Sequence, residues 1–457
     1  PISFLKMDIE GFEIPALIGA KNHIRNDYPK LAICVYHILS DIWEIPKLID
    51  TIRPDYTFFI RHYNSEQNWE TVIYAIPKTR KESRMQSGTD LPKWIVAPTA
   101  LERWSNADLV KDCGVIPYLF YKKWGYRASF LGTSKSEDYD NLRYVNGLEL
   151  VNTNENSLLE RITYIREHAS DIGALILYGL YTGYRELIDA YKTINPNGRI
   201  YLALDANSSW MDRIQWRNSV YEEILDNCDL IATSGHVMQR HLQEKWRWNI
   251  EYIPNGFYNF SGTDIAIDYN KKENTILTVA RLGTKQKSTN VLLEAFASIA
   301  DQIPQWQLRL VGPIEDSFQE YLEQYKQKHE SLGDRIHFTG AISDRCELYN
   351  EYKQSKIFAL PSIVEGGTPN VVAEALSFGN AMAVTKWDEY MDAIDSGRCG
   401  LASEINDVRG FAQVLLDLCS SHNLMELCKH SEAYAKKNFD MEKYVDVINN
   451  KLFGEEN

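Results

Sequence analysis

Residues 356–380 read KIFALPSIVEGGTPNVVAEALSFGN, and this stretch decides the fold. Lys356–Ser362 is an apolar run with the length of a buried strand. After a loop, Thr368 is a suitable N-cap and Pro369 suits the first position of a helix, while Gly379 is a natural place for that helix to stop. A buried strand, a glycine-containing loop and a helix in this order predict one unit of a parallel α/β sheet.

The loop and the helix of this unit suit an anionic ligand. A helix N-terminus exposes unpaired N–H groups and a partial positive charge, and Gly366 and Gly367 let a ligand approach the backbone closely. Glu374 lies on a polar stripe of the helix, where its carboxylate can accept hydrogen bonds from vicinal hydroxyls. Taken alone, the unit is equally consistent with an ordinary turn whose acids, Glu365 and Glu374, are simply solvated.

Two cations are predicted at the same edge of this sheet. Arg281 follows the expected strand 275–280, and Lys287 precedes a helix that starts near Asn290. Since the carboxyl ends of parallel strands meet at one edge, both cations should lie beside the glycine loop, where they match a diphosphate. A single Arg or Lys is most often a plain surface residue, but the joint placement of these two favours a binding site.

The order of predicted elements divides the chain into α/β blocks. Residues 1–80 alternate strand-like and helix-like stretches, and 81–90 are polar without an apolar face, which predicts a linker. Residues 91–258 and 259–430 alternate strands and helices again, and 431–457 are expected to form a C-terminal helix that crosses back to the N-terminal domain of this pair. The fold class is therefore α/β, with two doubly wound domains after a partial α/β fragment.

The composition of the chain argues against several classes of function. The 457 residues carry a formal net charge of -14, which disfavours binding to nucleic acid. The seven cysteines lack zinc or redox spacing, so reduced thiols in a cytoplasmic protein are expected. No apolar run reaches the ~20 residues of a membrane span. Because the chain begins at Pro1 and enters a strand at once, we expect a further segment upstream.

Residues 275–402 resemble the donor-binding domain of glycosyltransferase family 4, the large retaining GT-B family. The matching motifs are ARL with the later Lys287, then LRLVGP, IHFTGAIS and FALPSIVEGGTPNVVAEALSFG. Residues 91–274 and the tail near 439–452 resemble the family more loosely, in layout and in the IPNG at 253–256. The resemblance implies two facing Rossmann-like domains that move a sugar from a nucleoside-diphosphate sugar to a glycan or lipid-linked acceptor, in polysaccharide biosynthesis.

The resemblance also implies roles for single residues. Arg281 and Lys287 look like the pair that holds the donor diphosphate and stabilises it as it leaves. Glu365 looks like the acid near the donor sugar, and Glu374 like the acid on the ribose. Backbone contacts to sugar and phosphate would come from Gly366, Gly367, Thr368, Pro369, Asn370 and Val371. The family usually places seven residues between the two acids and this chain has eight, with the extra residue in the Gly-Gly-Thr loop.

Retention of the anomeric configuration, by attack on the same face, is a further implication of the resemblance. No cofactor and no metal are expected, because the two cations take the place of a metal at the leaving diphosphate. We interpret the acids Asp138 and Asp140 as part of a solvated loop, and so predict no metal site. Lys287→Ala and Glu374→Ala are each expected to reduce activity steeply without unfolding the protein.

The acceptor is expected in the block 91–258, whose first strand and loop the resemblance places at 112–132. Asp205 and His236 follow predicted strands and are candidates to line the acceptor side, although such residues are more often caps or surface residues. Asn207, Ser208 and Ser234 also follow predicted strands, and the same two interpretations apply to them. Basic and aromatic residues mix at 122–127 and 245–248, which suggests either a peripheral membrane contact or, more commonly, a surface of snorkelling side chains.

Residues 1–80 resemble the carboxyl half of an FkbM-type methyltransferase domain, through FLKMDIEGFE, the ALIGA helix, and the strands IRHY and ETVIYAIP. In such a domain Asp8 and Glu10 would end a strand near the cofactor or the substrate. The chain lacks the glycine-rich cofactor loop, so no binding of S-adenosylmethionine is expected. The sheet of this fragment should have an exposed or rearranged edge.

Other functions stay open at this point. A GT-B nucleotide-sugar epimerase has the same fold but needs acid and base residues in the cleft, which the sequence does not identify. A silent carbohydrate-binding scaffold would have no need of Arg281, Lys287 and Glu374 together. A bifunctional parent protein that also methylates a glycan is a further hypothesis.

Overall fold

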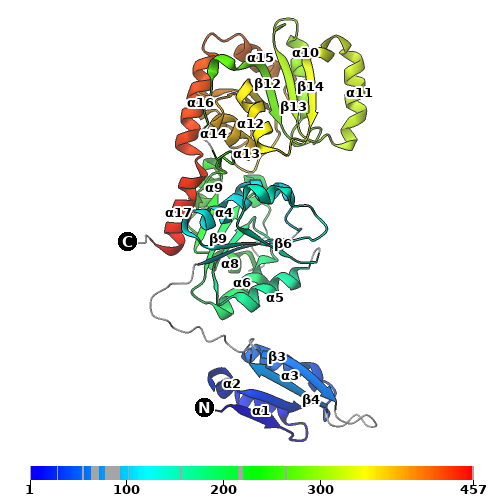
Figure 1. Cartoon of the computed structure of the whole chain (residues 1–457), viewed down its shortest axis with the longest axis vertical. Helices are drawn as coiled ribbons and strands as arrows, with labels where there is room; N and C mark the ends of the chain where they lie inside the picture. The colour runs from blue at the N-terminus through cyan, green and yellow to red at the C-terminus, as the bar shows by residue number, and fades with distance from the viewer. Residues whose placement is uncertain are drawn as a thin grey trace. The chain divides into compact units, whose positions relative to one another are not determined.

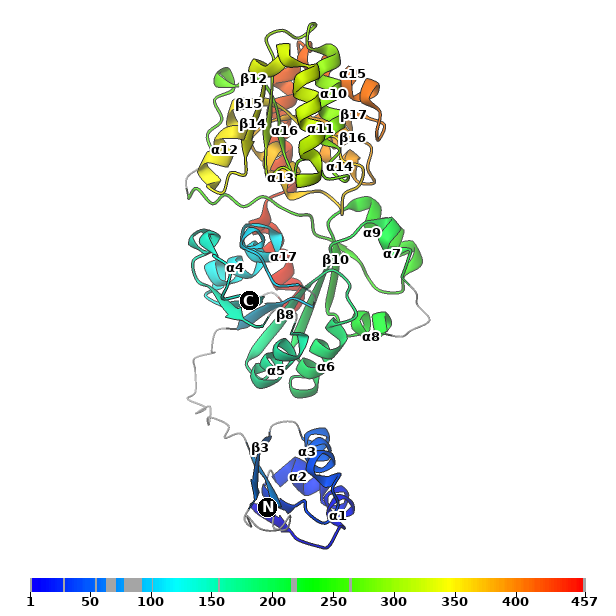
Figure 2. The same cartoon turned by 90° about the vertical axis from the view of Figure 1, so that its right-hand side faces the viewer.

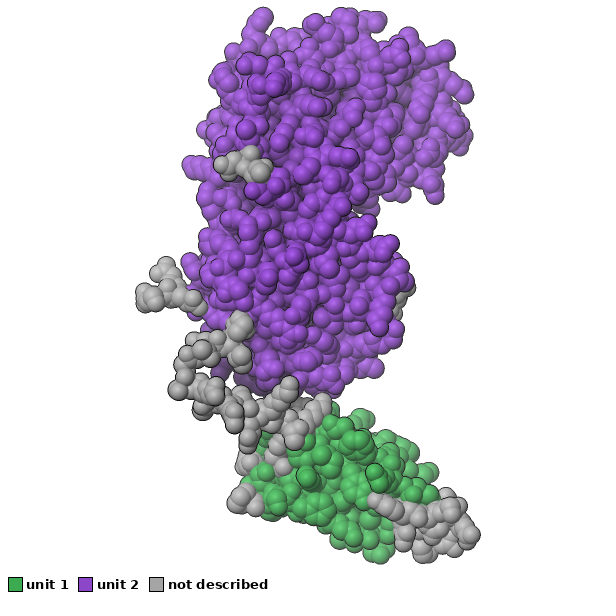
Figure 3. All heavy atoms as spheres, in the orientation of Figure 1, with its two compact units in different colours: residues 1–91 green, residues 92–457 purple. Residues whose placement is uncertain are grey.

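A computed structural model gives the fold of the chain. It describes residues 2–27, 29–53, 56–62, 71–77, 93–100, 102–154, 157–214, 220–262 and 265–454. The chain divides into two compact units, residues 1–91 and 92–457 (Figure 3). The predicted linker, 81–90, lies outside the described residues.

In its described residues, the first unit is a four-stranded mixed sheet with three helices (Figure 1). In sheet order its strands are β1 (Phe4–Met7), β2 (Lys30–Cys34), β4 (Thr71–Pro77) and β3 (Tyr56–His62), and its helices are α1 (Glu13–Gly19), α2 (Lys21–Asp27) and α3 (Asp41–Ile52). Strands β1 and β2 are parallel and the other two pairs are antiparallel. Within the described residues β1 pairs only with β2, and Phe4 is 55% exposed, which agrees with the predicted exposed edge.

The second unit contains the two predicted Rossmann-like domains. The first has a seven-stranded parallel sheet in the order β11-β10-β9-β8-β5-β6-β7. Its strands are β5 (Trp94–Pro98), β6 (Arg127–Thr133), β7 (Leu148–Asn152), β8 (Ile172–Tyr178), β9 (Arg199–Leu204), β10 (Leu230–Thr233) and β11 (Glu251–Tyr252). Its helices are α4 (Asp112–Trp124), α5 (Leu158–His168), α6 (Tyr184–Ile194), α7 (Ser208–Met211), α8 (Val220–Asp226) and α9 (His236–Lys245).

The central strand β5 shows why this sheet needs helices on both faces. Trp94 and Val96 belong to one buried cluster, while Ile95 and Ala97 belong to another on the opposite face. Successive side chains of a strand point to opposite faces, so a continuous apolar run is buried only when both faces are covered.

The resemblance placed the first strand and loop of this domain at 112–132, and that placement is wrong. The first strand is Trp94–Pro98, and residues 112–124 form α4, which ends at Gly125 with a φ of 67°. The apolar run inside α4 is buried almost all round, with Val115, Ile116 and Leu119 at 3% exposure or less. A helix buried on all sides lacks the one-sided periodicity that distinguishes it from a strand.

The second domain has a six-stranded parallel sheet in the order β14-β13-β12-β15-β16-β17. Its strands are β12 (Glu273–Val279), β13 (Gln307–Val311), β14 (Ile336–Gly340), β15 (Ser355–Leu360), β16 (Ala381–Thr385) and β17 (Gly400–Ser403). Its helices are α10 (Thr289–Ile299), α11 (Gln319–Lys328), α12 (Arg345–Gln354), α13 (Asn370–Ser377), α14 (Tyr390–Ala393), α15 (Val408–Cys419) and α16 (Leu424–Asn438).

Residues 356–380 form the predicted strand, loop and helix, but the helix begins one residue later than predicted. Pro369 is the N-cap of α13 and Asn370 its first residue, so Thr368 is not the cap. The Thr368 hydroxyl is buried without a hydrogen-bond partner. The helix ends as expected, because Gly379 has a φ of 63° that favours glycine.

The last helix, α17 (Met441–Phe453), packs on the first Rossmann-like domain, where it contacts α4, β9 and β10 (Figure 2). Met441, Val445, Ile448 and Leu452 join the buried cluster of that domain. The chain passes between the two domains near Phe257 and again near Asp440, and these two residues form a parallel bridge. No helix among the described residues has the length and apolar character needed to span a bilayer.

Candidate active site

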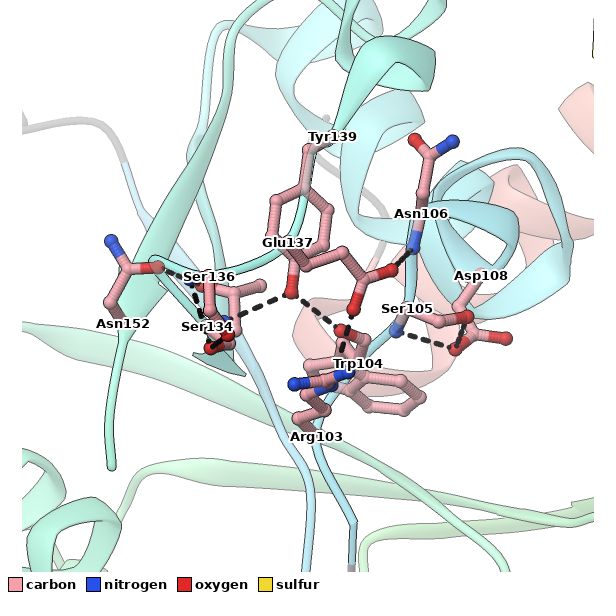
Figure 4. A network of polar contacts seen from close by, with 11 residues as sticks. Arg103, Trp104, Ser105, Asn106, Asp108, Ser134, Ser136, Glu137, Tyr139 and Asn152 are labelled. Atoms are coloured by element: carbon pink, nitrogen blue, oxygen red, sulfur yellow. Dashed lines mark hydrogen bonds and ion pairs between the residues drawn. The ribbon is translucent and has the colours of Figure 1, made fainter. Parts of the chain in front are cut away.

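A network of polar contacts holds the loop that follows β5 (Figure 4). The Tyr139 hydroxyl donates to the carbonyl of Trp104 at 2.7 Å and accepts from the Ser134 N–H at 3.0 Å. The Asn106 N–H donates to a Glu137 carboxylate oxygen at 2.7 Å. The loop is therefore fixed by side chains and leads to α4, whose first residue is Asp112. The nearby acids Asp138 and Asp140 are exposed, as predicted.

On the second domain, Lys287 and Glu365 form an ion pair. The Lys287 Nζ lies 2.5 Å from Glu365 Oε1, and the two side chains are only 14% and 6% exposed. Gln286 adds hydrogen bonds to the carbonyl of Val364 at 3.0 Å and to Glu365 Oε2 at 3.3 Å. The loop after β12 and the loop after β15 are thus joined by a buried charge pair at the carboxyl edge of the sheet.

Arg281 lies on the same loop as Lys287 but is exposed. Its side chain makes no hydrogen bond or ion pair with any of the described residues. An unpaired guanidinium at the carboxyl edge of a parallel sheet is available to a ligand phosphate.

Glu374 belongs to a buried polar trio. It forms an ion pair with Arg345, and it accepts a hydrogen bond from the Tyr352 hydroxyl at 2.7 Å. The side chains of Glu374 and Arg345 are each 11% exposed, and both residues line a small cavity with Asn370 and Asp112. An ionised carboxylate has about four acceptor positions, so Glu374 can still accept hydrogen bonds from ligand hydroxyls.

The glycine loop touches the first domain. The Ser234 hydroxyl donates to the Gly366 carbonyl at 2.9 Å, and the Thr368 N–H donates to the Ser234 carbonyl at 3.3 Å. Gly367 has a φ of 92°, and a Cβ at that position would lie 2.0 Å from the Ser234 hydroxyl. Asn370 Nδ2 donates to Asp112 at 3.2 Å. The expected donor loop therefore lies directly against the carboxyl edge of the other sheet.

Asp205 and Asp112 line the cleft from the first domain. Both border a cavity that also reaches Ser234, and Asp205 borders a second cavity of about 270 Å³ next to Gly366. Asp205 is exposed at the cleft rim, where desolvation by the surrounding cleft, followed by the negative charge of Asp112, raises the pKa of its carboxyl to about 6. Burial also raises the pKa of Asp112. An acid with a pKa near neutrality beside the glycine loop is suited to accept or donate a proton near pH 6.

His236 takes part in a contact between the domains. Its Nδ1 lies 3.1 Å from an Asp392 carboxylate oxygen, and this hydrogen bond raises the pKa of His236. Beside it, the buried Glu389 carboxylate accepts from the N–H groups of Val237 at 2.9 Å and Met238 at 2.7 Å, at the start of α9. His236 thus belongs to a junction in which an acid of one domain caps a helix of the other.

The basic and aromatic stretches suggested for a membrane contact are engaged within the protein. Lys123 lies 2.5 Å from Asp446, and Arg127 lies 2.8 Å from Glu149. The further pairs are Lys122 with Glu442, Lys245 with Asp212 and Arg247 with Asp226. These pairs agree with the interpretation as an ordinary surface.

Several residues of the site were not predicted from the sequence. They are Asp112, Tyr181, Trp210 and Arg345 around the cavities, and Tyr352 behind Glu374. Arg345 had a local signal, because Asp344 caps α12 through the N–H groups of residues 346 and 347 and so places Arg345 in its first turn. A contact between Asp112 and the donor loop, 258 residues later, has no local signal.

Comparison with known proteins agrees with this geometry. Residues 273–421 match the family described as Glycosyl transferases group 1, and residues 1–66 match the Methyltransferase FkbM domain. A glycosyltransferase from Rickettsia africae is 14% identical, with a TM-score of 0.60 over 80% of this chain and 100% of its own. Anabaena HepE bound to UDP is 15% identical, with a TM-score of 0.58 over 79% and 99%. Sucrose-phosphate synthase from Thermosynechococcus elongatus is 15% identical, with a TM-score of 0.59 over 78% and 98%.

The second unit therefore has the GT-B fold, and residues 273–421 within it match the group 1 glycosyl transferase family. The first unit carries the FkbM match. No curated protein matches the chain by sequence.

Proposed function

We propose that the chain is a retaining glycosyltransferase that moves a sugar from a nucleoside-diphosphate sugar to a hydroxyl of a glycan or a lipid-linked acceptor. The observation that carries the proposal is the meeting of Arg281, Lys287 and the glycine loop at one sheet edge, against the acids of the facing sheet. Solved relatives support the donor class, since HepE was determined with UDP and glucose. A cytoplasmic role in polysaccharide synthesis would fit such a donor.

The chemistry of the donor side follows from charge. Breaking the bond between sugar and phosphate develops negative charge on the leaving diphosphate. Lys287, held by Glu365, and the N–H groups at the start of α13 are preorganised to stabilise that charge, and the unpaired Arg281 is available to add a second cation. We propose that these groups act without a metal. Glu374 would hold the ribose hydroxyls, and Glu365 would contact the donor sugar while it holds Lys287 in place.

Release of free nucleoside diphosphate from a panel of nucleotide sugars tests the function. We expect the purified chain to hydrolyse one donor slowly without an acceptor, and to do so in the presence of EDTA. An epimerase would convert the sugar and leave the nucleotide sugar intact, and a scaffold would bind without turnover. Either result would contradict the proposal. NMR of the product formed with an acceptor would give the anomeric configuration.

On the acceptor side, Asp205 is expected to act in its ionised form, as partner of the attacking hydroxyl. Because its pKa is about 6, kcat/KM for the acceptor should fall about tenfold per pH unit below pH 6. Asp205→Asn should lower kcat/KM by about 10²-fold and abolish this acid limb. Initial rates between pH 5 and 8 measure both effects.

The charged groups facing Asp205 are Asp112, Lys111, Asp108 and Glu365. Asp171→Asn, an exposed acid of the same domain, is the matched control and should keep the wild-type profile. An acid limb that persists unchanged in Asp205→Asn would assign the titration to another group.

A further inference from the structure

The first unit contains a cluster of acids and one histidine that glycosyl transfer does not use. Asp8 follows β1, and His37 lies shortly after the neighbouring parallel strand β2, so both lie at the carboxyl edge of these two strands. Glu13 begins α1 and Asp41 begins α3 at the same edge. Four elements therefore bring titratable side chains to one place.

Three of these side chains lie close enough together to bind one ion, with His37 offering one of its two ring nitrogens. One ligand atom from each of Asp8, Glu13 and His37 lies within 4.8 Å of the other two. His37 Nδ1 lies 3.4 Å from Glu13 Oε1, and His37 Nε2 lies 3.8 Å from Asp8 Oδ1 and 3.3 Å from Glu10 Oε2. Ligands bound to one metal at about 2.0–2.2 Å stand roughly 3.0–3.6 Å apart.

Glu13 carries the strongest indication of a missing ligand. Its side chain is 0% exposed, and its Oε1 accepts from the Ile9 N–H at 2.9 Å. Its Oε2 is buried and has no hydrogen-bond partner, and the same holds for His37 Nδ1. A buried carboxylate oxygen without a partner is costly, so native proteins normally supply a donor or a cation.

The local charge is also unbalanced. Asp41 is 2% exposed, and burial together with the charge of Glu13 raises the pKa of its carboxyl. With Asp8 and the exposed Glu10, four carboxylates meet one histidine. A divalent cation would neutralise this excess and give Glu13 Oε2 a partner.

We propose that Asp8, Glu13 and His37 form a binding site for a divalent metal ion in the first unit. One imidazole and two carboxylates suit a metal of intermediate hardness, such as Mn²⁺ or Zn²⁺. Three protein ligands leave coordination positions for water or for an oxygen atom of a substrate. This site departs from the expectation of no metal in the chain, and it lies in the unit that carries the FkbM match.

Titration of the whole chain with Mn²⁺, followed by electron paramagnetic resonance, tests the proposal. We expect one Mn²⁺ per chain to bind at micromolar concentration and to show a nitrogen coupling from an imidazole. Glu13→Gln keeps the shape of the side chain and should weaken binding at least tenfold. His37→Gln should abolish the nitrogen coupling.

The matched control is Asp50→Asn, an acid on α3 outside the cluster, which should bind Mn²⁺ like the wild type. Circular dichroism shows whether each variant is folded. If Glu13→Gln fails to fold, the nitrogen coupling in His37→Gln still decides the question. The proposal would be overturned if the wild type did not bind Mn²⁺, or if His37→Gln bound it with wild-type affinity and kept the nitrogen coupling. In either case protonation, and not a metal ion, would balance the charge of the cluster.

Discussion

Lys287→Ala is expected to lower kcat for sugar transfer by about 10²–10³-fold, the usual cost of removing one preorganised group that stabilises a developing anion. The loss should exceed that of an ordinary surface cation, because the Lys287 side chain is only 14% exposed and its ammonium acts with little screening by water. The variant also leaves the buried Glu365 carboxylate unpaired beside the diphosphate. Steady-state kinetics with a saturating donor measure the effect.

Lys285→Ala is the matched control, since Lys285 is exposed on the same loop and has no ion pair within the described residues. We expect its kcat to stay within twofold of the wild type. Lys287→Arg keeps the positive charge and should recover part of the activity. Wild-type turnover in Lys287→Ala would mean that the donor binds in a different cleft.

Glu374→Ala is expected to affect stability as well as activity. Arg345 would become a buried charge without its partner, which costs about 3–5 kcal/mol of the free energy of unfolding. The binding of UDP should weaken about tenfold to hundredfold, as expected for the loss of hydrogen bonds to a charged group. Urea unfolding and calorimetric titration with UDP measure the two effects separately. Glu347→Ala, an exposed acid on α12, should change neither.

A double variant separates the two roles of Glu374. Arg345→Met together with Glu374→Gln removes both charges and keeps an acceptor for the Tyr352 hydroxyl. Replacing a buried ion pair by neutral groups of similar volume is often neutral for stability. We expect the double variant to unfold at the same urea concentration as the wild type. Its affinity for UDP should nevertheless remain low. Recovery of UDP affinity along with stability would show that the charge of Glu374 is not needed to bind UDP.

These outcomes revise an expectation drawn from the sequence. Glu374→Ala was expected to lose activity without unfolding, because only its place on the polar stripe of a helix could be inferred. The expectation of a polar stripe apart from the buried face is wrong for Glu374, because its side chain is buried against Arg345 and Tyr352. Partners 22 and 29 residues away on another helix leave no trace in the local pattern of polar and apolar residues.

The parallel sheets and the strand, glycine loop and helix of 356–380 were predictable because their signals are local. An apolar strand, a glycine at a left-handed position and a helix start lie within 25 residues in 356–380. The acceptor side was predicted less well. The loop after β5 is held by side chains of 103–139 rather than by glycines, and its contact with the donor loop depends on how the two domains face each other.

The return of α17 to the first Rossmann-like domain has a consequence for how the protein folds on the ribosome. Met441, Val445, Ile448 and Leu452 complete the hydrophobic cluster that also contains Ile95 and Phe130. The first Rossmann-like domain therefore stays unfinished until the second has been translated. During that interval the apolar surface that α17 later covers remains open to chaperones, and the two domains reach their final stability together.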